Sequence, residues 1–325
     1  MLPVAPGVFW VRMKLPFQLD HINLWLLDDG DGWVIVDCGI ADPATQAAWE
    51  AVFDAALGGR PVTRVIVTHL HPDHVGLAGW LCERFDAPLL MSRTDYLLCR
   101  TLVLDTGREA PPEGVRFYQR AGFNDEQLAL YRKRFGGFGL GVHRLPQSYR
   151  RMQDGQTLTI GGREWRLVVG RGHAPEHICL WCPDLNVIIS GDQILPRISS
   201  NVSVFPTEPD ADPLSDWLES CHRLRDLLPE DVLVLPSHNE PFLGAATRLQ
   251  ALIDEHEANM EKLLALLDGP KRAVDCFPAL FRSRITSGNF GMATGESLAH
   301  LNCLMGRGHV RRIRHPEGAD LYERT

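Results

Sequence analysis

The stretch RVIVTHLHPDHVG, residues 64–76, decides the fold of this chain. It begins as a continuous β-branched run, which is typical of a strand buried on both faces, and it leads into a helical pattern over residues 75–85. A helical pattern at 43–57 precedes it, and a further strand-like run, PLLMS at 88–92, follows. Strands and helices therefore alternate, and this alternation predicts an α/β layered core.

The middle of this stretch, HLHPDH, places four ligand-type side chains within six positions. His69 and His71 project to the same side of an extended chain, because strand side chains repeat every two residues. Pro72 keeps His71 extended and presets a turn, so that Asp73 and His74 swing round to face the same space. Imidazole nitrogen and carboxylate oxygen together suit zinc or a similar first-row ion. One short loop is therefore predicted to present a metal site.

A chance cluster of ordinary residues is the alternative explanation for this loop. A lone histidine is more often a surface or core residue than a ligand, by roughly three to one. Four titratable groups within six positions reverse that preference, because packing them together is costly without a cation. We therefore prefer the metal-site hypothesis.

The rest of the chain adds two further groups of strands. The first 40 residues predict a meander with tight turns, formed by VFWVRM, INLWLL and WVIVDCG. After a helical insertion at about 94–150, the strand pattern resumes with TLTI, EWRLVV, HICLWC and VIIS, and it returns in VLVLP at 232–236. Helices are predicted at 213–228 and 244–267.

The pair Gly269–Pro270 ends the second of these helices and marks the predicted domain boundary. Residues 1–268, which contain the insertion, are assigned to a large domain, and residues 269–325 to a small one. In the small domain we expect two short helices, at about 272–283 and 293–305, followed by a hairpin of the runs HVRRIR and DLYER.

The His-x-His-x-Asp-His pattern resembles that of the metallo-β-lactamase superfamily. The other motifs of that family can be matched in order over about residues 5–268, each at the end of a predicted strand. The matched residues are Asp37 in VIVDCG, His173 in GRGHAPEH, Asp192 in IISGDQIL and His238 in VLVLPSHNEP. One departure is Glu176, which stands where the family more often has glycine before the next histidine, His177.

The resemblance implies a four-layer αββα catalytic sandwich with a C-terminal appendage similar to a winged helix. It also implies sites for two divalent ions, held by His69, His71 and His173 and by Asp73, His74 and His238. Asp192 would bridge both ions, and an aspartate rather than a cysteine there resembles glyoxalase II and its relatives, not the true β-lactamases. The implied metal is zinc, with manganese and iron as alternatives that share these ligands.

The same resemblance assigns roles to individual residues. Asp73 and Asp192 are the candidate catalytic residues, because they would orient a hydroxide activated by the two metals and accept its proton. Asp37 would anchor the metal loop from behind, with an ordinary turn aspartate as the alternative. His177 would support the site or serve a structural role.

Composition places the chain among ordinary globular proteins. Its 325 residues are 45% hydrophobic and 23% charged, and no apolar run reaches the roughly 18 residues that a membrane span needs. The N-terminal stretch lacks the pattern of a secretory signal, so the cytoplasm is the expected location. Eight scattered cysteines are expected to be reduced thiols. Two of them, Cys179 and Cys182, share one strand-like run, where their side chains should point to opposite faces.

Net charge is distributed unevenly along the chain. The total is −8, but residues 271–325 hold nine Lys or Arg against five Asp or Glu, which leaves −12 on the remainder. An acidic body argues against a polyanion as the main partner, although the basic run with Arg311, Arg312 and Arg314 keeps nucleic acid open as an alternative. The simpler expectation is that this tail packs on the acidic body, at the active-site side or in a homodimer contact.

Three functions follow as hypotheses. The first is a glyoxalase II-like hydrolase of a small-molecule acyl substrate, a thioester or ester, since a thiolate leaves with little help from an acid. The second is a nuclease or nucleic-acid-processing enzyme of the same superfamily. The third is a binding protein on a retired hydrolase fold, which the intact ligand set disfavours. Arg197 and Asn201 flank the metal loops as candidate pocket residues, and the substrate itself is not identified by the sequence.

Overall fold

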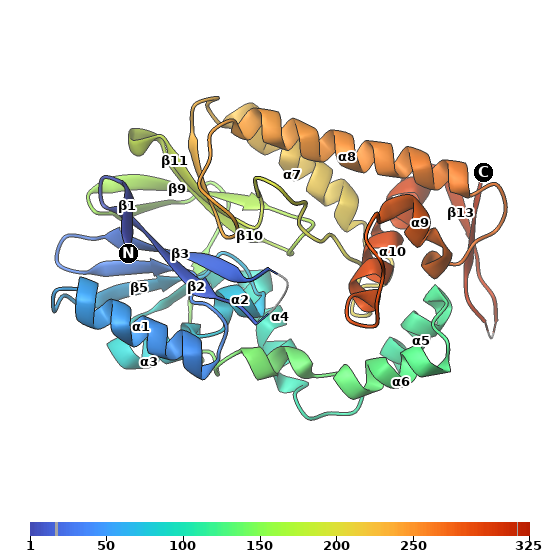
Figure 1. The fold of residues 1–325 in the computed structure, drawn as a ribbon, viewed down its shortest axis with the longest axis horizontal. Helices are drawn as coiled ribbons and strands as arrows, with labels where there is room; N and C mark the ends of the chain where they lie inside the picture. The colour runs from blue at the N-terminus through green and yellow to red at the C-terminus, as the bar shows by residue number, and fades with distance from the viewer. Residues whose placement is uncertain (17–18, 317) are drawn as a thin grey trace.

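The structure is an α/β sandwich in which two β-sheets lie face to face between layers of helices (Figure 1). It is a computed structural model that describes residues 1–16, 19–316 and 318–325. One sheet has seven strands in chain order from β1 to β7, and the other has five in the order β12-β11-β10-β9-β8. Both sheets are mixed, because each joins antiparallel strands to parallel ones. This arrangement confirms the predicted four-layer sandwich.

The first sheet forms from the N-terminal part of the chain and one later strand. Its strands are β1 (Leu2–Ala5), β2 (Val8–Lys14), β3 (His21–Asp28), β4 (Trp33–Val36), β5 (Val62–Ile66), β6 (Leu89–Ser92) and β7 (Arg150–Met152). Helices α1 (Pro43–Ala56) and α3 (Ala78–Phe85) cover its outer face, where Trp49 and Leu81 are fully buried. The sequence predicts β2 to β6 but neither β1 nor β7, because these short end strands contain Pro3 or two arginines in place of an apolar run.

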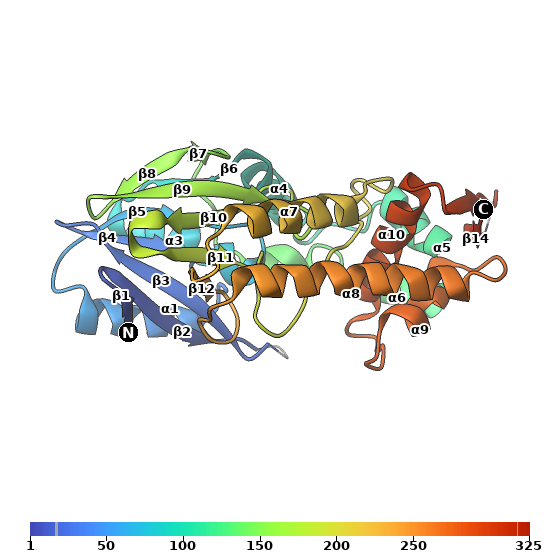
Figure 2. The same cartoon turned by 90° about the horizontal axis from the view of Figure 1, so that it is seen from above.

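The second sheet comes from the middle of the chain. Its strands are β8 (Thr157–Ile160), β9 (Arg163–Gly170), β10 (His177–Cys182), β11 (Val187–Gly191) and β12 (Leu233–Pro236). Helices α7 (Pro213–Leu227) and α8 (Ala245–Leu266) run side by side (Figure 2). Helix α7 packs against β9 of this sheet, and α8 extends from the sheet to the C-terminal elements. Cys179 packs in the core beneath these helices and Cys182 packs between the sheets, which confirms that the two thiols point to opposite faces. All eight cysteines are buried free thiols.

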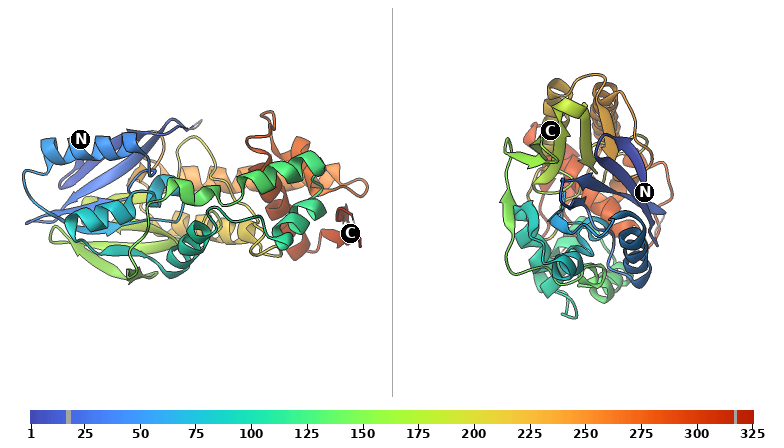
Figure 3. Two further views of the ribbon diagram at one scale, coloured as in Figure 1. Left: turned by 90° about the horizontal axis from the view of Figure 1, so that it is seen from below. Right: turned by 90° about the vertical axis from the view of Figure 1, so that its left-hand side faces the viewer.

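A helical insertion separates the strands β6 and β7. It consists of α4 (Arg93–Leu104), α5 (Pro112–Ala121), α6 (Asp125–Arg134) and the 3-10 turn η1 (Gly137–Gly141). Figure 3 shows α5 and α6 beside the C-terminal helices, and the ring centroids of Phe123 and Phe290 are 5.0 Å apart. The Asp320 amide also donates to the Arg120 carbonyl oxygen at 2.8 Å. The insertion therefore connects the sandwich to the C-terminal part of the chain.

The residues after α8 form a small unit of helices and one hairpin. Its elements are η3 (Ala273–Cys276), α9 (Phe277–Leu280), α10 (Phe290–Gly306), β13 (Val310–Ile313) and β14 (Leu321–Arg324). The helix expected at 272–283 is wrong in detail, because this stretch divides into a 3-10 turn and a single α-helical turn that ends at Leu280. Hydrophobic residues of this unit share one core with α7, α8 and the second sheet. The winged-helix resemblance and the boundary at residue 268 remain predictions.

Acidic residues of the larger part of the chain pair with the basic tail. Arg312 on β13 donates to Asp210 at 2.8 Å, and Arg307 at the end of α10 makes two hydrogen bonds to Glu257 of α8. The C-terminal unit is therefore held on the acidic body by charge as well as by the shared core, as the charge distribution predicts. None of the helices in the described ranges is both long and apolar enough to cross a membrane.

The HLHPDH loop, residues 69–74, leads into a broken helix rather than the single helix expected over 75–85. Here α2 (Pro72–Val75) stops at Gly76, and α3 begins two residues later. A β-carbon on Gly76 would lie 2.4 to 2.6 Å from three backbone atoms. Only glycine permits this close approach, so packing of the loop against its neighbours overrides the helical pattern.

Candidate metal centre

Five strand ends meet at one edge of the sandwich, and each carries a residue that the sequence predicts for the site. Asp37 follows β4, the HLHPDH loop follows β5, and His173 lies between β9 and β10. Asp192 follows β11, and His238 follows β12. The structure brings all seven candidate ligands together in two adjacent groups, and within each group the ligand atoms lie within 4.8 Å of one another.

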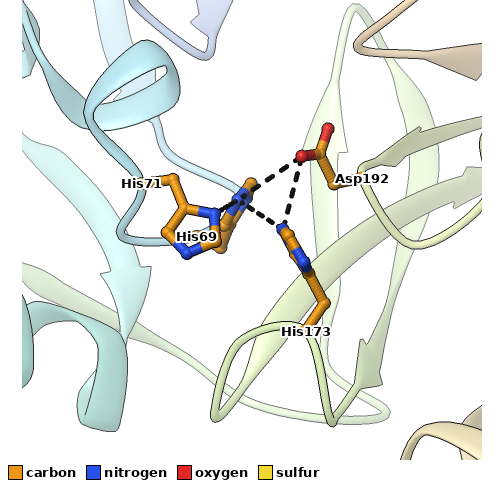
Figure 4. A group of neighbouring side chains, drawn as sticks. All are labelled: His69, His71, His173 and Asp192. Carbon is orange, nitrogen blue, oxygen red and sulfur yellow. Dashed lines mark hydrogen bonds and ion pairs between the residues drawn. The ribbon is translucent and has the colours of Figure 1, made fainter. Parts of the chain in front are cut away.

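The first group contains His69, His71, His173 and Asp192 (Figure 4). Nε2 of His69 lies 3.0 Å from Nδ1 of His71 and 3.3 Å from Nε2 of His173. Oδ2 of Asp192 faces the same space, at 3.3 Å from Nε2 of His173 and 4.0 Å from Nε2 of His69. Three imidazole nitrogens and one carboxylate oxygen thus converge, in the number that a four-coordinate zinc ion takes.

The second group contains Asp73, His74 and His238. Oδ2 of Asp73 lies 3.7 Å from Nε2 of His74 and 3.5 Å from Nε2 of His238. The second oxygen of Asp192, Oδ1, lies 3.4 Å from Nε2 of His74 and 3.5 Å from Nε2 of His238. Asp192 therefore offers one carboxylate oxygen to each group, which is the geometry of a bridging ligand.

Buried polar atoms at the junction of the two groups are suited to a positively charged ion. Within the part of the chain that the structure describes, Nε2 of His74 and Oδ1 of Asp192 are buried without a hydrogen-bond partner. Their only contact with each other is the ion pair at 3.4 Å; burying such atoms without hydrogen bonds is costly, and a divalent ion would satisfy both. The residues present therefore fit a two-metal centre, and zinc, manganese and iron all accept this set of nitrogen and oxygen donors.

Burial and neighbouring charges set the protonation of these ligands. Burial holds the pKa of His69 well below its ordinary value and lowers the pKa of His71 to about 3, so both imidazoles are neutral and offer a lone pair. Burial alone would raise the pKa of the Asp192 carboxyl, but the neighbouring His74 and His238 hold it well below its ordinary value. These neutral imidazoles and this ionised carboxylate are the forms that bind metal. In the second group, burial alone would lower the pKa of His74 and His238, but the neighbouring carboxylates, above all that of Asp192, raise it, so a metal ion there would displace a proton.

Asp37 supports the HLHPDH loop from behind. Its Oδ2 accepts hydrogen bonds from Nδ1 of His74 and from the Thr68 hydroxyl, both at 2.8 Å, and its Oδ1 accepts from the Thr68 amide at 2.8 Å. The hydrogen bond to Nδ1 fixes the tautomer that leaves Nε2 of His74 facing the second group. Asp37 has a φ of 62°, a left-handed conformation that aspartate adopts more readily than most side chains.

Replacing Asp37 with asparagine is expected to weaken metal binding by about 10- to 100-fold, because the negatively charged acceptor that orients His74 is lost. Competition with a chromophoric chelator would measure the affinity. The matched control is Asp86→Asn, which makes the same change at an exposed aspartate that is also left-handed, with a φ of 49°. Wild-type affinity in Asp37→Asn would show that Asp37 is only a turn residue.

Backbone carbonyl groups orient two further ligands. Nδ1 of His173 donates to the Asn201 carbonyl oxygen, and Nδ1 of His238 donates to the His21 carbonyl oxygen, both at 2.8 Å. Each bond leaves Nε2 of the imidazole directed at the ligand groups. The sequence does not single out His21, because its carbonyl oxygen supports His238 through a backbone atom that no side-chain pattern reveals; its Nε2 also accepts from the Asn239 amide at 2.8 Å.

His177 holds the turn that carries Asp192 and is not a member of either ligand group. Its Nε2 accepts a hydrogen bond from the Asp192 amide at 3.0 Å. Gly191 stands between them with a φ of 52°, and a β-carbon there would lie 2.5 Å from the His177 ring. The imidazole therefore positions the backbone of the candidate bridging residue.

Asp95 is a supporting residue that the sequence does not single out. This buried carboxylate lies in the first turn of α4, where Oδ1 accepts from the Leu70 amide at 3.0 Å and Oδ2 accepts from the Glu176 amide at 2.8 Å. Burial raises its pKa to about 6. Asp95 thereby ties the HLHPDH loop to the loop of His173, and the unusual Glu176 is part of that connection. In the sequence, SRTD at 92–95 is indistinguishable from an ordinary helix start.

The two candidate pocket residues occupy different positions. Arg197 forms an exposed ion pair with Glu240 at 2.9 Å. Asn201 lies behind His173, on the side away from Nε2, since its carbonyl oxygen accepts from Nδ1.

Comparison with known proteins accounts for this set of strand ends. Residues 18–238 match the family described as Metallo-beta-lactamase superfamily, and this segment contains every candidate ligand. The chain belongs to the metallo-β-lactamase superfamily. Residues 260–325 match the family described as Metallo-beta-lactamase-like, C-terminal domain. The protein is accordingly a metallo-hydrolase with a His and Asp centre for two metal ions, and its closer likeness to glyoxalase II remains a prediction.

Three similar proteins match most of the length of this chain. The crystal structure of a beta-lactamase domain protein from Burkholderia ambifaria has a TM-score of 0.90 and 42% identity, and the match covers 100% of this chain and 94% of that one. The probable metallo-hydrolase YqjP of Bacillus subtilis is 24% identical over 91% of this chain and 92% of its own length. The acyl-coenzyme A thioesterase MBLAC2 of Gallus gallus is 25% identical over 78% of this chain and 84% of its own length.

Proposed function

We propose that this metallo-hydrolase cleaves thioesters of carboxylic acids at the paired metal centre. The observation that carries the proposal is the Asp192 carboxylate, which offers one oxygen to each of two ligand groups at 3.3 to 4.0 Å. Two divalent ions held there would supply Lewis-acid activation of a water and of the substrate carbonyl. No side-chain nucleophile is then needed for hydrolysis.

Asp73 is suited to handle the proton of the attacking water. Its ion pairs with His74 and His238 both use Oδ2. Oδ1 of the same carboxylate can accept the proton from water while Oδ2 stays directed at the imidazoles. Asp192 would hold the attacking oxygen between the two ligand groups and thereby orient it toward the carbonyl carbon.

Two observations favour a thioester over other acyl substrates. A thiol is far more acidic than an alcohol, with a pKa of about 8.5 for the cysteine side chain, so it departs as a thiolate with little need for an acid to protonate it. The relative from Gallus gallus is described as an acyl-coenzyme A thioesterase. Leu140 is an exposed apolar residue, 76% accessible, in η1, which packs against α2 of the HLHPDH loop. Such a side chain suits contact with an acyl group.

A matched substrate series tests the proposed function. Zinc-loaded protein would be offered acetyl, hexanoyl and dodecanoyl thioesters of coenzyme A, oxygen esters of the same acids, a lactone, a phosphodiester and short RNA. We expect kcat/KM for thioesters to exceed that for matched oxygen esters by at least about tenfold, or ~1.4 kcal/mol in the barrier. Leu140→Asn should raise KM for the dodecanoyl thioester but not for the acetyl one, whereas Leu227→Asn at the end of α7 should change neither.

Faster turnover of the phosphodiester or of RNA would reject the thioesterase proposal and favour a nuclease. We expect weak RNA binding, because Arg312 is paired with Asp210 at 2.8 Å and Arg311 with Glu323 at 2.7 Å. Those cations are already neutralised within the chain. Tight binding at physiological salt with a steep salt dependence would contradict this expectation.

A further inference from the structure

A short segment, residues 199–204, lies between the metal centre and the C-terminal unit. On its inner side, the Ser200 hydroxyl donates to the backbone carbonyl oxygen of Asp192, and the Asn201 carbonyl oxygen accepts from Nδ1 of His173 at 2.8 Å. Two candidate metal ligands therefore rest directly on this segment, which we call the linking segment.

Helix α10 of the C-terminal unit holds the other side of the linking segment. Nδ2 of Asn201 donates to Oε2 of Glu296 at 2.8 Å, and the Val204 amide donates to the Gly295 carbonyl oxygen at 3.0 Å. The Ser203 hydroxyl donates to Oδ1 of Asn201 at 2.6 Å. Both ends of the Asn201 side-chain amide are thus fixed, and the Asn201 backbone carbonyl, which accepts the hydrogen bond from His173, is held with them.

Gly295 makes the close approach of α10 possible. A β-carbon at this position would lie 2.8 Å from both side-chain atoms of Ser203 and 3.0 Å from the Val204 carbonyl oxygen. Glycine inside a helix costs about 1 kcal/mol relative to alanine, so its presence here needs a local reason. The local reason is that any side chain at this position would collide with the linking segment.

The side-chain carboxyl group of Glu296 is largely buried, which costs free energy because its charged form loses contact with water. Burial raises its pKa to about 7, although the hydrogen bond from Asn201 acts in the opposite direction. Packing of α10 on α8 does not explain this buried carboxyl group. The ion pair between Arg307 and Glu257 already joins these two helices at the other end of α10.

We propose that α10 is a positioning element of the metal centre, in which Gly295 and Glu296 hold the linking segment so that Asn201 orients His173 and Ser200 supports Asp192. The inference rests on the metal centre of the proposed function but not on its substrate. If Asn201 shifts, His173 loses the acceptor that fixes its tautomer and orientation, and the first ligand group loses one of its three imidazoles.

Zinc affinity, measured by competition with a chromophoric chelator, tests this role without any substrate. We expect Gly295→Ala and Glu296→Ala each to weaken zinc binding by about 10- to 100-fold, the usual effect of losing a group that orients a ligand. Glu296→Gln should stay close to wild type, because its side-chain carbonyl can still accept from Asn201. Gly291→Ala is the control in the same helix, since nothing lies within 4 Å of a β-carbon there.

The visible spectrum of the cobalt-substituted protein provides a second readout, because it reports the ligand geometry around the ion. Altered spectra in Gly295→Ala and Glu296→Ala, with apoprotein melting temperatures near that of the wild type, would support the positioning role. Wild-type zinc affinity and spectra in both variants would overturn it, as would an equal loss in Gly291→Ala. Failure of the thioester screen would leave these results unaffected, so the two proposals can fail separately.

Discussion

Replacing Asp192 with alanine is expected to remove most of the bound metal and to lower kcat/KM by at least about three orders of magnitude. The side chain offers an oxygen to both ligand groups, so its loss leaves each group one donor short and two cations facing each other without a carboxylate between them. Lewis-acid activation supplies several kcal/mol of transition-state stabilisation, and each ~1.4 kcal/mol corresponds to a factor of ten in rate.

Metal content by elemental analysis and steady-state kinetics on the same preparation would check this result. Asp192→Asn keeps the size of the side chain, so a similar loss there would identify the negative charge as the missing property. Asp184→Ala serves as a control, because Asp184 lies in the short turn η2 (Pro183–Leu185) between β10 and β11 and outside both ligand groups. Unchanged metal content in Asp192→Ala would refute the bridging role.

Removing the metal ions from the wild-type protein is expected to lower its melting temperature by roughly 10 °C. An ion that binds only the folded chain contributes about 4 kcal/mol at a free concentration 1,000 times its Kd, and each kcal/mol shifts the melting temperature by about 2 to 4 °C in a large domain. Without the ions, buried atoms such as Nε2 of His74 and Oδ1 of Asp192 are left with ion pairs at 3.4 Å or more and, in the described part of the chain, without a hydrogen bond.

Differential scanning calorimetry before and after chelation would measure this shift, and adding zinc back should reverse it. The same treatment should have little effect on Asp192→Ala, which holds little metal to lose. A melting temperature that is insensitive to chelation in the wild-type protein would contradict a stabilising two-metal centre.

The ligands of the HLHPDH loop can be predicted from the sequence because the features that bring them together lie within the loop itself. The alternation of strand side chains and the turn at Pro72 together bring its ligands to one space, and no other part of the chain is needed for that step. The remaining ligands were matched only through the order of family motifs, since His173, Asp192 and His238 have no local pattern of comparable strength.

Residues that orient the ligands were harder to predict. His21 supports His238 across 217 residues of chain through a carbonyl oxygen, and Asn201 supports His173 in the same way across 28 residues. Asp95 lies in a stretch that resembles an ordinary helix start. Such contacts depend on how distant strand ends meet at the edge of the sandwich, which periodicity and composition do not specify.

The charge distribution predicts where the C-terminal tail packs but not which residues it contacts. The excess of positive charge beyond residue 271 predicts attraction to the acidic body, and the Arg312 and Asp210 pair confirms it across 102 residues. The particular partner could not be predicted, because Asp210 lies in an irregular stretch without a pattern of its own. The break between α2 and α3 was missed for a related reason, since Gly76 is required by its neighbours in space rather than in sequence.

The helix α8 determines how the two family segments can vary relative to each other. It runs unbroken from residue 245 to 266, about 33 Å at 1.5 Å per residue, and the C-terminal family segment begins at residue 260, inside it. The first family segment ends at residue 238, shortly before this helix begins, so the second segment is joined to it largely through a rigid rod instead of a flexible tether. One residue inserted within the helix upstream of residue 260 would rotate everything beyond it by about 100° around the rod axis. Insertions in the surface loops of such a protein should be tolerated far better than insertions inside this helix, because the proposed role of α10 depends on the rotational setting of α8.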